Sequence, residues 1–86
     1  MITGAQMRAA RGLLRWSASA LAKKAEVSLP TIQRMEKVDG VPGAYATNLD
    51  AVQKALELAG VEFIPENGSG AGVRFREPLR KRPQET

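Results

Sequence analysis

The 86-residue chain contains no cysteine and no histidine. Without cysteine it has no disulfide, no thiolate metal ligand and no cysteine nucleophile. Without histidine it lacks the most common metal ligand, the usual general base and the central member of a Ser-His-Asp triad. No paired-carboxylate site is visible, and an isolated serine or lysine without an activating partner is a weak nucleophile. We therefore expect no enzyme, no metal site and no cofactor.

The sequence also lacks long hydrophobic runs. No apolar stretch approaches the ~20 residues that are needed to cross a bilayer, so we expect no membrane partner. Residues 1–4 lack the basic segment followed by an apolar one that marks a secretory signal. A chain of 86 residues fits one small domain, and we expect it in the cytoplasm.

The charge that is present is unevenly distributed. Lys and Arg number 13 against 9 Asp and Glu, which gives a net charge of +4. Residues 1–37 hold seven basic and two acidic side chains. Residues 38–66 hold one basic and five acidic side chains, and residues 67–86 hold five basic and two acidic ones. A basic first half favours a polyanion as partner. A basic surface that is merely solvated would give the same count, so charge alone does not decide between the two.

Three helices are predicted in the first half of the chain. Residues 3–15 carry apolar side chains at helical spacing, and their stripe is formed by Met7, Ala10, Leu13 and Leu14. Ser17 and Ser28 are suited to cap two shorter helices, because a serine hydroxyl can accept a hydrogen bond from a free backbone N–H of the first turn. Pro30 would lie in the first turn of the third helix, where a missing N–H costs nothing.

A fourth helix and a β-hairpin are predicted in the second half. Thr47 and Asp50 have the spacing of a capping box at the start of that helix, and Gly60 is suited to end it. After Gly60 the hydrophobic period changes from 3.6 to 2, which predicts a hairpin over residues 61–76 with a glycine-rich tip. Residues 77–86 carry charge and proline with few apolar side chains, which predicts a disordered basic tail.

The most informative stretch is residues 17–36, which fits a short helix, a tight turn and a second short helix. Two helices that short are not stable alone, so they must pack at a steep angle on the helices before and after them. That arrangement exposes the first turn of the helix that begins near Ser28, with a basic residue one turn later. A protruding helix of this kind fits the major groove of DNA.

These residues resemble the Cro/repressor-type helix-turn-helix family, also called the xenobiotic-response-element family. The resemblance covers residues 3–60, and the hairpin resembles an extension of some bacterial members. It is carried by Arg8-Ala9-Ala10-Arg11, Trp16-Ser17, Leu21-Ala22, Val27-Ser28 and Thr31-Ile32-Gln33-Arg34-Met35-Glu36. It implies an all-α, four-helix lambda-repressor-like helix-turn-helix domain over residues 1–60, with a C-terminal β-hairpin.

The resemblance also implies roles for individual residues. Arg11 and Glu36 match a partly buried ion pair that ties the first helix to the recognition helix at residues 28–37. The N-terminus at Ser17 would point at a phosphate, where free N–H groups favour an anion. The implied DNA-binding set comprises the base-facing Leu29, Pro30 and Arg34 with Gln33 beside them, and Ser17, Ser28, Thr31 and Lys37 on the surface around them.

Three departures from the family pattern matter. Glu26 stands where the family usually has glycine in the turn, and a positive φ there would cost ~1–2 kcal/mol. Ala18 stands where the family often has glutamine, which removes one backbone contact. Leu29 and Pro30 offer almost no hydrogen bonds to bases. Direct readout would then fall on Arg34, which suits guanine O6 and N7, with Gln33 assisting and Leu29 against a thymine methyl.

The sequence thus predicts a sequence-specific, DNA-binding transcriptional regulator. Double-stranded DNA would be its partner, and a homodimer would place two recognition helices about one turn of DNA apart. We expect the dimer contact at the hairpin, through Phe63, Ile64 and Phe75. One alternative is an antitoxin-like module whose hairpin or tail binds a partner protein. Another is an RNA-binding or nucleoid-type protein that uses charge without reading bases.

Overall fold

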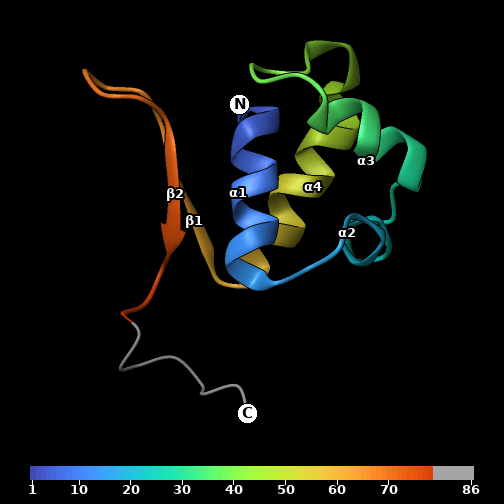
Figure 1. The fold of residues 1–86 in the computed structure, drawn as a ribbon, viewed down its shortest axis with the longest axis horizontal. Helices are drawn as coiled ribbons and strands as arrows, with labels where there is room; N and C mark the ends of the chain where they lie inside the picture. Colours follow the sequence, from blue (N-terminus) through green and yellow to red (C-terminus); the bar gives the residue numbers. More distant parts are fainter. Residues whose placement is uncertain (79–86) are drawn as a thin grey trace.

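The computed structural model of the chain describes residues 1–78. In that range the fold is mainly helical and ends in a two-stranded antiparallel hairpin (Figure 1). The predicted tail is therefore outside the described residues from residue 79 onward. The elements follow in the order α1 (Gly4–Leu14), α2 (Ala18–Ala25), α3 (Leu29–Glu36), the 3₁₀ turn η1 (Gly43–Tyr45), α4 (Ala46–Leu58), β1 (Val61–Ile64) and β2 (Gly72–Phe75).

Side chains cap the first three helices. Ser17 and Ser28 accept hydrogen bonds from the N–H groups of Ala20 and Thr31, as predicted. The start of α1 was not predicted in this form. Thr3 precedes the helix, and its hydroxyl accepts from the N–H of Gln6 while the Gln6 side chain accepts from the N–H of Thr3. This reciprocal capping box satisfies two otherwise free donors.

The capping box predicted at Thr47 and Asp50 is wrong. Helix α4 begins at Ala46, directly after η1, and no side chain caps its N-terminus. Because the 3₁₀ turn runs straight into the helix, Thr47 is already helical and lacks the extended backbone that a capping residue needs. The predicted end of α4 is confirmed, since Gly60 follows its last turn with a φ of +109°.

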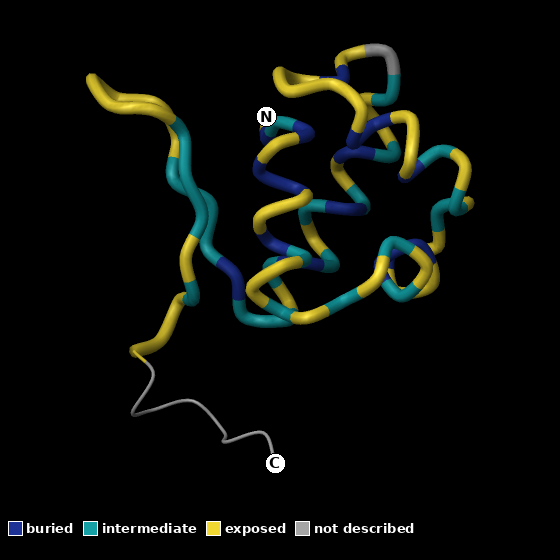
Figure 2. The backbone as a smooth tube through the Cα atoms, viewed as in Figure 1, coloured by how far each residue is buried: buried dark blue, intermediate teal, exposed yellow. Residues whose placement is uncertain are grey.

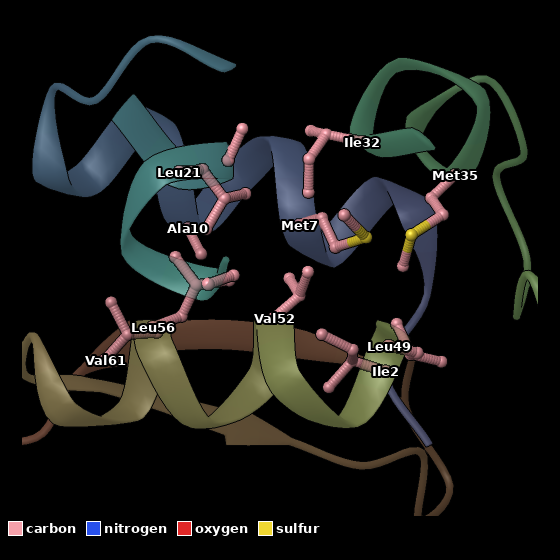
Figure 3. Close-up of a cluster of buried hydrophobic side chains, with 12 residues drawn as sticks. Ile2, Met7, Ala10, Leu21, Ile32, Met35, Leu49, Val52, Leu56 and Val61 are labelled. Atoms are coloured by element: carbon pink, nitrogen blue, oxygen red, sulfur yellow. The ribbon is translucent and has the colours of Figure 1, made fainter. Parts of the chain in front are cut away.

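Helices α1, α2, α3 and α4 surround one hydrophobic core (Figure 2). Val52 and Leu56 on α4 point toward Met7 on α1 and Leu21 on α2 (Figure 3). Leu13, expected in this core, is exposed instead. The fully packed cluster consists of Ile2, Met7, Ala10, Leu21, Ala22, Ala25, Ile32, Met35, Leu49, Val52, Leu56 and Val61.

The hairpin packs against the helices. Val61 is completely buried, and Phe63 and Val73 lie against the core. Phe63, Ile64 and Phe75 are all half-buried. Because Phe63 packs against the core of its own chain, it is not freely available for the dimer contact that the sequence predicts. The buried Gln6 side chain donates to the carbonyls of Ile64 and Gly72 at 3.3 and 2.8 Å, which fastens the hairpin to α1. Figure 1 shows α1 between the hairpin and α3.

Candidate nucleic-acid interface

Helices α2 and α3 form a compact corner with a buried and an exposed side. Ile32 and Met35 of α3 are fully buried, and so is Leu21 of α2. The turn between the two helices contains Glu26 in the left-handed region, with φ 58°. The position therefore does require a positive φ, which costs ~1–2 kcal/mol for a residue with a Cβ.

The outer side of α3 carries polar and basic side chains. Pro30, Gln33, Arg34 and Lys37 are exposed. In the part of the chain that the structure describes, Arg34 and Lys37 form no ion pair. Within the described residues, one guanidinium in the last turn of α3 and one ammonium group at the residue that follows it therefore have no carboxylate partner.

The first turn of α3 is built from two hydroxyls and two apolar side chains. Ser28 Oγ accepts from the Thr31 N–H at 3.4 Å and donates to Thr31 Oγ1 at 2.8 Å. Ser28 is exposed and Thr31 is half-buried. Leu29 is also half-buried and packs against the core, which leaves part of its side chain for contact with a ligand.

The N-terminus of α2, which the resemblance predicts to face a phosphate, begins with an exposed residue. Ser17 is exposed, and among the described residues its side chain is engaged only by the N–H of Ala20, in capping α2. The preceding Trp16 packs partly against the core. Lys24 Nζ lies 5.9 Å from the centroid of the Trp16 ring, within the range of a cation–π contact. This contact joins the residue just before the cap of α2 to the last turn of that helix.

Arg11 and Glu36 form the ion pair that the resemblance implies. Arg11 Nε and NH2 donate to the two carboxylate oxygens of Glu36 at 2.7 and 2.8 Å. These hydrogen bonds raise the pKa of Arg11 above its ordinary value, burial opposes that rise, and the charge of Glu36 adds to it. Arg11 NH1 also donates to the carbonyl of Trp16 at 3.0 Å. One guanidinium thus connects the start of α2 with the end of α3.

Arg8 makes a second connection that sequence reasoning missed. The sequence places it in a surface row with Arg11 and Arg15. In the structure it donates to the carbonyl of Glu36 and pairs with Asp39 at 2.7 Å. No local pattern could have shown this, because the partners lie 28 and 31 residues away. Arg8 is therefore engaged with the end of α3 instead of being a free surface cation.

The eight residues predicted to bind DNA thus come from two adjoining helices. Ser17 begins α2, and the other seven extend from the cap of α3 to its end. Six of the eight are exposed, and Leu29 and Thr31 are half-buried. We call this set of residues on two neighbouring helices the α2–α3 face: Ser17, Ser28, Leu29, Pro30, Thr31, Gln33, Arg34 and Lys37.

Other kinds of site find little support within residues 1–78. No group of three or more His, Cys, Asp or Glu residues is placed to hold a metal ion. None of the helices is both long and apolar enough to span a membrane. An open depression beside the end of α4 is lined by Lys54, Glu57, Leu58 and Arg76. Neither a protein-family model nor a curated protein matches this chain.

Proposed function

We propose that this chain is a sequence-specific DNA-binding regulator of transcription with a lambda-repressor-like helix-turn-helix. The observation that carries the proposal is the α2–α3 face. Its α3 part has a buried inner side and an exposed outer side that holds Pro30, Gln33, Arg34 and Lys37. A helix supported from behind and polar in front has the dimensions and chemistry to lie in a major groove. The proposal includes a cytoplasmic location.

Base contacts in this proposal come from the first two turns of α3. Arg34 donates to guanine O6 and N7, because a guanidinium can satisfy both acceptors at once. Gln33 lies beside it and supplies a second polar contact. Pro30 and the exposed part of Leu29 lie against a thymine methyl. Specificity at the start of α3 then depends on shape and apolar contact more than on hydrogen bonds.

Phosphate contacts flank these groups. The first turns of α2 and α3, which Ser17 and Ser28 cap, carry backbone N–H groups that favour a phosphate. Thr31 and Lys37 lie on the same surface. The excess of basic residues in residues 1–37 supports binding to a polyanion, although Arg8 and Arg11 contribute through α3 and not through direct contact.

Selection of bound duplexes from a random pool tests this proposal. We expect a preferred site, and we expect Arg34→Ala to lose ~1–3 kcal/mol of binding with relaxed preference at one base pair. Lys54→Ala is the matched control, because it removes the same charge from α4, where the Lys54 side chain is 75% exposed. The proposal fails if no sequence is enriched, or if Arg34→Ala binds the selected duplex as the control does.

We also propose that the chain binds DNA as a homodimer. Antiparallel strands alternate the direction of their backbone groups, and the N–H of Arg76 bonds to the carbonyl of Gly60 at 2.9 Å. The N–H and C=O of Val73 therefore point away from β1 and can pair with another strand. Ile64 on the outer side of the hairpin adds apolar contact. Sedimentation at micromolar concentration tests this, and a monomer bound to a non-palindromic site would contradict it.

A partner protein at the hairpin is the second candidate. The hairpin lies on the other side of α1 from α3 (Figure 1), and residues 65–70 at its tip are exposed. It can therefore engage another protein while the α2–α3 face is on DNA, as an antitoxin-like module would. A stable complex that needs the hairpin, with dimerisation intact, would favour this candidate.

A further inference from the structure

Helix α3 ends differently from the two helices before it. The residues that follow α1 and α2, Arg15 and Glu26, adopt left-handed backbone with φ 57° and 58°. The residue that follows α3, Lys37, stays right-handed with φ −70°. A helix that ends in this way lacks the usual left-handed reversal. The N–H groups of Lys37 and Val38 bond to the carbonyls of Arg34 and Met35, and the carbonyl of Glu36 needs a partner from elsewhere.

Arg8 supplies such a partner. Its guanidinium donates to the carbonyl of Glu36, the final residue of α3, and pairs with Asp39 three residues later. One turn earlier on α1, the N–H of Gly4 donates to the carbonyl of Gly40 at 2.9 Å. Residues 36–40 are thus held at successive points along one side of α1. A cation at a helix C-terminus is also favoured by the helix dipole.

We propose that Arg8 is a positioning residue for DNA recognition, and this rests on the function proposed above. Its guanidinium fixes the C-terminal end of α3 and thereby the angle at which the α2–α3 face meets the groove. Helix α3 has eight residues, about 12 Å of length, so a small displacement of one end moves the other by a similar amount. Hydrogen bonds to base edges weaken steeply with such misalignment.

Arg8 is not itself a DNA contact in this proposal. Both terminal nitrogens of its guanidinium are engaged, one by Glu36 and one by the carboxylate of Asp39. The Asp39 side chain is 90% exposed, so that ion pair adds little energy. It nevertheless places a negative charge beside Arg8, and this makes the spot unfavourable for a phosphate. The bond to the Glu36 carbonyl is the part that orients the helix.

Binding measurements on Arg8→Ala and Arg8→Lys test the proposal. The probes are the duplex selected by the wild-type protein and a scrambled duplex, over a range of salt. We expect Arg8→Ala to reduce the ratio of the two affinities about tenfold, with an unchanged salt slope. Arg8→Lys keeps the charge but loses the planar pair of donors, so it should discriminate less than the wild type. The matched control Lys54→Ala should keep the full ratio.

The opposite pattern would overturn the proposal. If Arg8 binds a phosphate, Arg8→Ala weakens both duplexes equally and lowers the salt slope by about 0.9. Arg8→Lys then keeps most of the affinity. An unchanged affinity ratio in Arg8→Ala would equally exclude a positioning role, whatever the variant does to thermal stability.

Amide hydrogen exchange separates the tether from the DNA function. In Arg8→Ala we expect about tenfold faster exchange at Lys37 and Val38, whose N–H groups bond to the last turn of α3, with no change at the hairpin. Uniformly faster exchange would show global destabilisation and overturn the local tether. If the wild-type protein shows no preference for any duplex, both the proposed function and the recognition role of Arg8 are refuted. Faster exchange at Lys37 and Val38 would then still support the tether.

Discussion

Removal of the Arg11 side chain should cost the fold about 3–5 kcal/mol, because it leaves a buried carboxylate without a partner. The Glu36 side chain is 9% exposed and that of Arg11 is 22% exposed, so water cannot replace the lost guanidinium. Domains of 86 residues are stable by roughly 4–13 kcal/mol. Arg11→Ala should therefore lose a large part of the total, with a Tm lower by at least about 12 °C.

A double variant that replaces both members of the ion pair tests the cause of this loss. Hydrophobic replacement of both members of a buried ion pair is often neutral or stabilising, since no charge is then left desolvated. Arg11→Met with Glu36→Leu should recover most of the loss. About 1 kcal/mol should remain, because the hydrogen bond from Arg11 to the Trp16 carbonyl is also gone.

Urea denaturation provides the assay, with circular dichroism and the fluorescence of Trp16, the only tryptophan. Lys54→Ala is the comparison variant. Its ion pair with Asp50 is 4.0 Å long, both side chains are about three-quarters exposed, and we expect a change within about 1 kcal/mol. An Arg11→Ala protein as stable as this control would refute the reasoning. So would a double variant no more stable than Arg11→Ala.

Four further substitutions test the backbone and the hairpin, each followed by thermal unfolding. Glu26→Gly should stabilise the protein by about 1 kcal/mol, because glycine relieves the positive φ; a lower Tm would contradict this. Gly4→Ala should destabilise by about 1–3 kcal/mol, since its methyl would collide with the backbone carbonyl of Val38. Gly12→Ala on the same helix meets nothing and should stabilise by up to about 1 kcal/mol; equal effects at the two glycines would refute the packing argument. Gln6→Glu keeps the helix cap but has no donor for the two hairpin carbonyls, so it should cost about 2–3 kcal/mol and speed exchange in β1 and β2. Unchanged exchange there would contradict that role.

Local features of the fold were predictable from the sequence. Ser17 and Ser28 predict the starts of α2 and α3, because a capping interaction joins residues only three positions apart. The buried positions Met7 and Ala10 of α1 follow from a simple period, although Leu13 on the same predicted stripe is exposed. The α2–α3 face could also be proposed in advance, since its residues lie within one short segment. The resemblance places glycine at the position of Glu26, and it left open whether the backbone there has the positive φ that the structure shows.

Long-range features were not predictable. The engagement of Arg8 by residues 36–39 depends on how two helices cross, and nothing near Arg8 in the sequence indicates it. Gln6 looks like an ordinary exposed helix residue until the hairpin covers it. The prediction for the start of α4 failed for a different reason, because a preceding 3₁₀ turn made the cap at Thr47 unnecessary. In each case a tertiary contact or an unrecognised turn overrode the local signal.

The burial of Ile2 and Val61 in one core has a consequence for the order of folding. Ile2 is 3% exposed and Val61 is fully buried, so the core is complete only when the two ends of a 60-residue loop have met. A nascent chain cannot close this structure until the residues after α4 have left the ribosome. The helices should therefore gain their stability together in a single cooperative step.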